Sequence, residues 1–278
     1  MPSDIVLPLC EMVRLATVHD LERIATVAAA GFYHSPTFKF QRKYHAKYPD
    51  DTLLSYKAEY RDSIVDPECV VLVAEDTVKD VEGLHVYDAL RGAVTYKPAS
   101  SLSRGRIIVG VSSISIVGSR YVGRFQPENV LDASAASSHV QSPNRDVCPK
   151  ASQLYSAMTG PAKAKHLAGQ MRLSTLAVHP AYWGRGHAQR LVHWCTQLAD
   201  LEGVPVGISA APMGAIIAAK AGFERQELVR IDPGSTNEST PCEEDAPVDG
   251  CVLWVAVRRP RSLSPSSNES ATSLSPGE

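Results

Sequence analysis

Apolar residues along this chain recur at two different spacings, which predict where helices and strands lie. Between Thr17 and Gly31 the apolar positions return every three or four residues, as on one face of an amphipathic helix. In several shorter runs, apolar residues occupy extended segments that end at turn-forming residues. In chain order the pattern predicts a strand at 13–16, helices at 17–31 and 50–64, strands at 69–74, 107–117 and 173–178, a helix that opens near 186, a strand at 204–208, a helix at 210–221 and a final strand pair at 223–231 and 251–258.

Two internal stretches are longer than ordinary connections between such elements. They cover residues 77–105 and 118–169. Loops of that length inside a compact domain are usually either functional or disordered. Within the second stretch, short helices are possible at 150–158 and at 162–167, while its serine-rich and asparagine-containing parts are typical of loop.

Two further segments have compositions typical of irregular structure. Residues 232–250 are acidic and rich in turn-forming residues, so we expect a loop there. Residues 259–278 are rich in serine and proline and hold too little apolar surface to order themselves, so a disordered tail is expected.

Composition narrows the class of protein. The chain has 278 residues, of which 44% are hydrophobic, enough for one sizeable core. A formal net charge of −2 gives no electrostatic footprint for nucleic acid or for an acidic membrane surface. The six cysteines are scattered, without partners at metal-site spacing, so no metal is expected. No apolar run approaches the roughly 18 residues that cross a bilayer and the first residues do not look like a secretion signal, so we expect a cytoplasmic protein.

The most specific motif follows the predicted strand at 173–178. Residues 183–188, with glycines at 184 and 186, form a turn that opens a helix. The first turn of a helix offers unpaired N–H groups and the positive end of the helix dipole, and glycines let an anion approach the backbone closely. These residues therefore predict a site for a phosphate or pyrophosphate group.

This motif resembles the signature of the GNAT superfamily of acyl-CoA-dependent N-acetyltransferases, which is Gln/Arg-x-x-Gly-x-Gly/Ala. The last two fixed positions fall on Gly186 and Ala188, and the flanking Val-His-Pro at 178–180 and Ala-Gly-Phe-Glu at 221–224 match the flanks usual in the family. One position departs from the signature. The chain has Trp183 where the family has Gln or Arg, and only Arg185 keeps a cation in the turn.

The resemblance implies a fold and a cofactor site. The fold would be of the α/β (α+β) class, with a GNAT-like mixed, mostly antiparallel central sheet flanked by helices and a splayed strand pair that binds CoA. Residues 12–258 would form this domain, including the insertions at 77–105 and 118–169, after an N-terminal segment at 1–11. The pyrophosphate and the pantetheine arm of acetyl-CoA would be held by the following residues: Leu176, Ala177, Val178, Gly184, Arg185, Gly186, His187 and Ala188.

The resemblance also implies transfer of an acetyl group from acetyl-CoA to an amine, by direct attack in a ternary complex. In the family a tyrosine on the last helix commonly protonates the leaving thiolate, but the matching position is Ala218, and residues 170–180 contain no carboxylate that could act as a base. The replacement candidates are Glu75 at a strand end, and Tyr33 and His34 in the connection between the first two helices. We expect His179, in the Val-His-Pro flank, to be structural.

Several alternatives stay open at this point. The favoured acceptor is a small-molecule amine, with no nucleic-acid or membrane partner and an unknown oligomeric state. A divergent member that binds acyl-CoA but catalyses another reaction, or none, is one alternative, and a protein or peptide N-acetyltransferase is another. The aromatic and basic connection at 32–48 either lines the acceptor pocket or forms a solvated face. The insertion at 118–169 is either a lid over the acceptor or an exposed decoration.

Overall fold

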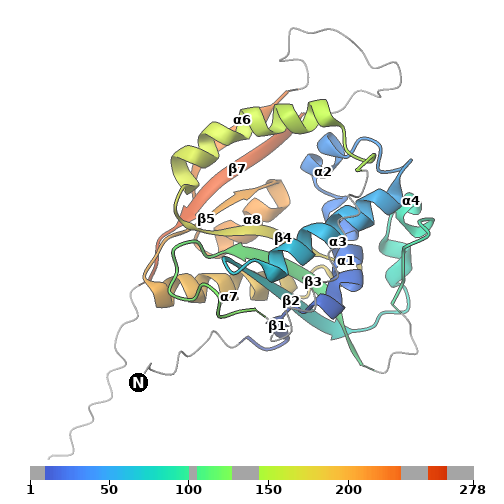
Figure 1. The fold of residues 1–278 in the computed structure, drawn as a ribbon, viewed down its shortest axis with the longest axis horizontal. Helices are drawn as coiled ribbons and strands as arrows, with labels where there is room; N and C mark the ends of the chain where they lie inside the picture. The colour runs from blue at the N-terminus through green and yellow to red at the C-terminus, as the bar shows by residue number, and fades with distance from the viewer. Residues whose placement is uncertain (1–9, 100–104, 127–143, 233–249, 262–278) are drawn as a thin grey trace, which may run out of the picture.

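The computed structural model describes residues 10–99, 105–126, 144–232 and 250–261, which build a single seven-stranded sheet with helices on both faces (Figure 1). The strand order is β1-β2-β3-β4-β5-β7-β6. The strands are β1 (Val13–Leu15), β2 (Cys69–Thr77), β3 (Arg106–Ser115), β4 (Met171–Val178), β5 (Val206–Ala210), β6 (Glu224–Ile231) and β7 (Cys251–Arg258). Neighbouring strands are antiparallel except β4 and β5, which are parallel. The predicted mixed, mostly antiparallel sheet is confirmed.

Alternation along the strands creates two hydrophobic cores, one on each face of the sheet. On β2, Val71 and Val73 pack with α1 (Leu21–Phe32) and α3 (Pro49–Val65), whereas Val70 and Leu72 pack on the opposite face with α7 (His187–Glu202). A further core lies between α6 (Pro149–Leu167) and the strands β6 and β7. None of the described helices is long and apolar enough to cross a membrane. The helical segments are η1 (Val18–Asp20), α1 (Leu21–Phe32), α2 (Pro36–Gln41), α3 (Pro49–Val65), η2 (Glu82–His85), α4 (Asp88–Arg91), α6 (Pro149–Leu167), η3 (Pro180–Tyr182), α7 (His187–Glu202) and α8 (Pro212–Lys220).

The structure corrects the elements predicted for the long insertions. Instead of two short helices, α6 is one helix that continues through Pro161 and runs along β7 (Figure 1). Proline removes a single intrahelical hydrogen bond there, while Ala162 and Leu167 on the buried face of α6 pack against β6 and β7, so burial outweighs the local preference. The connection at 32–48 also contains a helix, α2, that the sequence pattern did not predict. The predicted acidic loop and most of the predicted tail lie outside the described residues.

Residues 144–148 of the second insertion are anchored to the end of α2 and to the start of α3. Asp146 is fully buried, pairs with Arg42 and accepts a hydrogen bond from Thr52 Oγ1 (2.7 Å). Arg145 forms a two-pronged ion pair with Asp51 at the start of α3 (2.8 and 2.9 Å). These contacts fix where the insertion leaves the α2–α3 region and enters α6. The described part of the insertion is therefore packed against the domain rather than projecting from it.

The strands β4 and β5 part after a short parallel pairing. Residues 171–173 of β4 pair with residues 206–208 of β5, and the pairing stops there. The strand β3, in contrast, stays beside β4 as far as Val178. From Ser174 onward β4 therefore has no strand partner on its β5 side. The predicted parting of one strand pair is present in the structure.

Candidate active site

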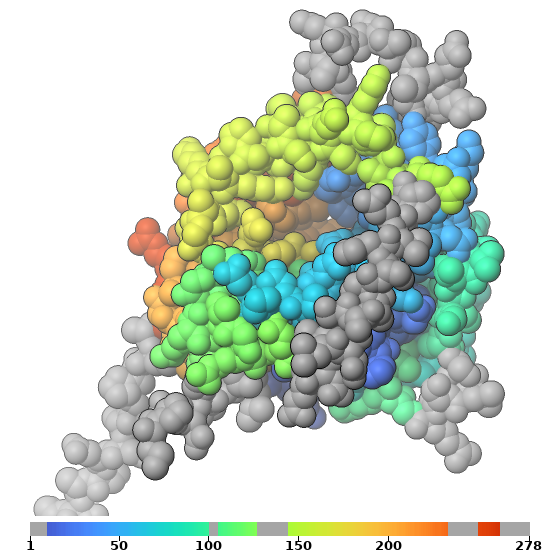
Figure 2. Space-filling model, in the orientation of Figure 1, coloured from blue at the N-terminus to red at the C-terminus, as the bar shows by residue number. Residues whose placement is uncertain are grey.

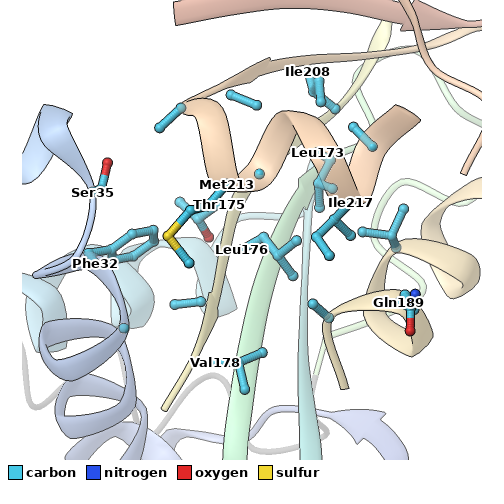
Figure 3. A pocket seen from close by; sticks show the side chains of 18 of the residues that line it. Phe32, Ser35, Leu173, Thr175, Leu176, Val178, Gln189, Ile208, Met213 and Ile217 are labelled. Carbon is cyan, nitrogen blue, oxygen red and sulfur yellow. The ribbon is translucent and has the colours of Figure 1, made fainter. Parts of the chain in front are cut away.

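A cavity of about 740 Å³ lies in the wedge between β4 and β5 (Figure 3). It is lined by the end of α1 and the start of α2, by β4 and β5, by the first two turns of α7, and by α8 along its length. In Figure 3, Phe32 and Gln189 lie on opposite sides of the cavity, with Leu176 and Val178 between them. The space-filling view shows that the molecule is hollowed between α3 and α6, on the face toward the viewer (Figure 2). The lining residues include no aspartate or glutamate.

The open edge of β4 presents backbone groups to this cavity. The His179 N–H donates to a carbonyl of β3 (2.8 Å), and alternate residues of an antiparallel ladder face the partner strand. Ala177 therefore also turns its peptide groups to β3, while those of Leu176 and Val178 point away from it. The carbonyl of Val178 accepts a hydrogen bond from the Trp183 indole N–H (2.7 Å). Of the three predicted strand residues, Leu176 thus has the peptide groups best placed for a ligand.

The glycine turn borders the cavity, and its Arg185 and His187 side chains both contact Asp76. Gly184 and Gly186 have φ values of 77° and 83°, a region that L side chains adopt only with strain. Arg185 Nη1 lies 2.5 Å, and His187 Nε2 2.9 Å, from Asp76 Oδ2 at the end of β2. Partial burial opposes ionisation of Asp76, but hydrogen bonds from the next amide and from these two side chains hold its pKa below the ordinary value.

The predicted turn residues therefore divide into two groups. Gly184, Gly186, His187 and Ala188 line the cavity, at the N-terminus of α7. Arg185 does not line it, and its charge is already balanced by Asp76. An anion in this part of the cavity would meet main-chain amides and the end of the α7 dipole.

A bulge in β4 marks the point where the two strands part. The pairing of β3 with β4 skips Ser174, which is the extra residue. The Thr175 hydroxyl accepts hydrogen bonds from the Tyr60 hydroxyl on α3 (3.0 Å) and from the Ser113 N–H (3.0 Å), and it lies 2.7 Å from Ser113 Oγ. Because both lone pairs of Thr175 Oγ1 are then in use, it donates its own proton to Ser113 Oγ. This network fixes the bulge from the α3 side.

Two of the three predicted catalytic residues lie outside the cavity lining. Glu75 forms an ion pair with Arg14 of β1 (2.7 Å), because the pairing of β2 with β3 shifts register between Ala74 and Glu75 and re-aims the strand end. Tyr33 stacks on Tyr87 with ring centroids 4.0 Å apart. Neither position supports the predicted role in proton transfer.

His34 does line the cavity, but at the end next to the glycine turn. Its ring meets the Trp183 ring edge-on, with centroids 4.9 Å apart. Burial and then the charge of Lys39 lower the pKa of His34, which favours the neutral ring. The Trp183 indole is hydrogen-bonded to the Val178 carbonyl. The bulge at Ser174 is four residues from Val178 along β4, a separation of about 13 Å. His34 is therefore remote from the point where β4 and β5 part.

Ala218 lines the cavity near this parting and is 4% exposed, so the position that carries the family's tyrosine does face the site. The sequence reasoning did not find the hydroxyl network of Tyr60, Ser113 and Thr175. The available signal was the run of buried polar residues in a strand, where Ser112 and Ser113 interrupt an otherwise apolar stretch. Among the described residues, no group of His, Cys, Asp or Glu is arranged to hold a metal ion.

Comparison with known proteins identifies relatives of this chain, although no family model matches its sequence. A protein from Stachybotrys chartarum named acetyltransferase is 28% identical over 212 residues, which cover 76% of this chain and 79% of the relative. The C-terminal condensation domain of Ebony, solved with β-alanyl-dopamine, has a TM-score of 0.51 at 10% identity and covers 90% of this chain and 100% of its own.

A further solved structure is similar over nearly the whole chain. It is described as a histone acetyltransferase and related acetyltransferase from Corynebacterium glutamicum, with a TM-score of 0.49, 15% identity and coverage of 93% and 99%. At such identities a structural likeness concerns the fold alone. The fold, the parted strands and the glycine turn at the start of α7 are the features expected from the resemblance to the GNAT superfamily, and the name of the relative supports an acetyltransferase.

Proposed function

We propose that the protein transfers the acetyl group of acetyl-CoA to the amine of a small acceptor, by direct attack within a ternary complex. The observation that carries this proposal is the continuity of the cavity. One lining joins the glycine turn at the start of α7, the open edge of β4 and the α1–α2 connection, so donor and acceptor can meet between β4 and β5. Residues that bind phosphate and residues that bind an acceptor therefore share one space.

Different parts of the cavity lining suit different parts of acetyl-CoA. The amides of Gly184, Gly186 and His187 suit the pyrophosphate, because a helix N-terminus with left-handed glycines favours an anion. The peptide groups of Leu176 suit the amides of the pantetheine arm. Peptide groups at the Ser174 bulge are suited to polarise the thioester carbonyl, because the Tyr60 network holds them rigid.

Proton transfer in this proposal relies on water and not on a side chain of the described lining. The lining holds no carboxylate, and the position of the usual tyrosine is Ala218. The attacking amine gives up its proton as its bond to the carbonyl carbon forms, and the departing CoA sulfur takes a proton as the C–S bond breaks. A thiol with an ordinary pKa near 8.5 is a tolerable leaving group without a dedicated acid.

The composition of the lining favours an acceptor with an apolar body and a single amine. The α1–α2 side contributes Phe32 and Pro36, and α8 contributes Met213, which points into the same space (Figure 3). A polyamine has a second cation that would remain unpaired, since the described lining contains no acidic side chain. Unpaired charges that lose water on binding cost affinity.

Mass spectrometry of products tests the proposal. The purified protein is incubated with acetyl-CoA and a panel that contains arylalkylamines, alkylamines, polyamines, amino acids and peptides. We expect acetylation of amines with apolar bodies, and little with polyamines. Absence of any acetylated amine, with CoA binding retained, would favour the alternative of a divergent acyl-CoA-binding protein. The position of Ala218 is the observation that supports this alternative. Acetylated peptides alone would favour a protein N-acetyltransferase.

A further inference from the structure

The insertion between β2 and β3 contacts the turn that leads into the phosphate site. Its residue Glu82 is 2% exposed, and its carboxylate accepts hydrogen bonds from both terminal nitrogens of Arg23 on α1 (2.6 and 2.8 Å). Arg23 also donates through Nε to the carbonyl of Ile108 on β3 (2.8 Å). Glu82 is thereby tied to α1 and, through Arg23, to the centre of the sheet.

The same carboxylate holds η3, the turn that directly precedes Trp183. The Tyr182 hydroxyl donates to Glu82 Oε2 (2.9 Å) and accepts the Lys79 N–H (3.1 Å), while Lys79 Nζ donates to the carbonyl of Ala181 (2.6 Å). Tyr182 is fully buried and is one of the residues that line the cavity. We call Arg23, Lys79, Glu82 and Tyr182 the Glu82 network.

A second tie lies at the other end of the phosphate turn, where Asp76 binds Arg185 and His187. The segment from Tyr182 to His187 is thus held at both ends by residues of β2 and of the insertion that follows it. Within this segment the chain lacks the family's Gln or Arg, since the position is Trp183. The arginine that this segment does contain, Arg185, is already paired with Asp76. Phosphate binding by the segment therefore depends on how well its main-chain amides point toward one position.

Convergent amides bind an anion tightly only if the turn is already in the binding conformation, because ordering a mobile turn on binding consumes affinity. A network of buried, charge-assisted hydrogen bonds provides such order. The third group near Glu82 is His179, whose Nε2 lies 3.9 Å from Glu82 Oε1 and has no hydrogen-bond partner among the described residues. Burial keeps the His179 ring neutral by lowering its pKa to about 4, so Arg23 is the cation that balances Glu82.

We infer that Glu82 is a positioning residue for the acetyl-CoA site: through Tyr182 it holds the Trp183–His187 turn in the conformation in which its amides meet the pyrophosphate. The inference rests on the proposed function, because it assigns the turn to acetyl-CoA. The inference also assigns the insertion at 77–105 a role in binding acetyl-CoA rather than the acceptor.

Calorimetric titration with CoA tests the inference in three single variants. Tyr182→Phe removes one hydroxyl and keeps the buried ring, and Glu82→Gln removes the charge that Arg23 balances. The control is Tyr96→Phe in the same insertion, because the Tyr96 hydroxyl is buried without a hydrogen-bond partner in the described residues and lies 4.0 Å from the Cβ position of Gly83. We expect the Kd for CoA to rise at least about fivefold in the first two variants and to stay unchanged in the control.

Two further measurements separate positioning from a merely structural role. With acetyl-CoA saturating, kcat of Tyr182→Phe should stay within about twofold of the parent, so the defect appears in KM. Amide hydrogen exchange at 183–187 should become faster in Tyr182→Phe and not in Tyr96→Phe. An unchanged Kd for CoA in folded Tyr182→Phe and Glu82→Gln, with or without a lower melting temperature, would overturn the inference and leave the proposed function intact. A parent protein that fails to bind CoA would overturn both.

Discussion

Replacing Thr175 by valine removes the hydroxyl on which Tyr60 and Ser113 converge at the β4 bulge. Valine keeps the branched shape of threonine, so packing changes little. The Tyr60 hydroxyl and the Ser113 N–H, which both donate to Thr175 Oγ1 at 3.0 Å, lose their acceptor. Tyr60 is fully buried and Ser113 is 3% exposed, so neither donor has ready access to bulk water.

Each buried donor left without a partner costs about 1–3 kcal/mol, so Thr175→Val should lower the free energy of unfolding by about 2–6 kcal/mol. Whole-domain stabilities are about 5–15 kcal/mol, so this is a large effect. At the roughly 2–4 °C per kcal/mol expected for 150–250 residues, the melting temperature should fall by at least about 4 °C. Thr175→Ser is the matched control, because it keeps the hydroxyl and loses one methyl group.

Urea unfolding of a double-mutant cycle with Tyr60→Phe checks the reasoning. In Thr175→Val/Tyr60→Phe no tyrosine hydroxyl is left buried and unpaired, so the double variant should be more stable than the sum of the two single losses by about 1 kcal/mol or more. Strict additivity, or a loss below about 1 kcal/mol in Thr175→Val, would show that the hydroxyl network does not stabilise the bulge.

Three other predictions concern the turn, the buried histidine and the last helix. Gly186→Ala should weaken CoA binding at least tenfold in titrations, whereas Gly203→Ala, which carries the same left-handed strain (φ 66°) at the far end of α7, should only lower stability; equal CoA affinities in the two would exclude the turn as the phosphate site. His179 is buried with its pKa lowered to about 4, so the folded state excludes a proton that the unfolded state binds below about pH 6.5; stability should therefore fall as the pH drops from about 6.5 to 4, by up to about 3 kcal/mol, and a His179→Gln variant with the same pH slope in urea unfolding would refute this assignment. Ala218→Tyr should raise turnover several-fold by supplying a proton to the leaving thiolate, and a loss of turnover together with weaker acceptor binding would place the acceptor above residue 218.

The structure of the glycine turn could be predicted because all of its determinants are local. Glycines at 184 and 186, a strand before them and a helix after them lie within one continuous segment, and the structure has each in the expected order. The strands were predictable for the same reason, since alternation of apolar residues is read directly from neighbours in sequence. The course of α6 was not, because packing of its buried face on β6 and β7 overrides the local signal of Pro161.

The remaining parts of the site depend on partners that are distant in sequence. Glu75 looked like a base at a strand tip, but a register shift and Arg14, 61 residues away, decide where its side chain lies. Thr175 and Tyr60 are 115 residues apart, and Glu82 and Tyr182 are 100 residues apart. Neither pair has a sequence motif, and only the fold brings its members within hydrogen-bond distance.

The short contact between β4 and β5 would let acetyl-CoA, bound as proposed, help to hold the fold together. The strands β1–β4 and β5–β7 meet through only three residue pairs, and beyond them the sheet is interrupted by the cavity. A pantetheine arm lying along Leu176 would act as a partial extra strand across that seam. At one hundred times its Kd, a ligand adds about 2.7 kcal/mol to folding stability. The stability of the contact between the two halves of the sheet would then depend on the concentration of acetyl-CoA. Without acetyl-CoA, the sheet would be expected to open first between β4 and β5, at the proposed site of the reaction.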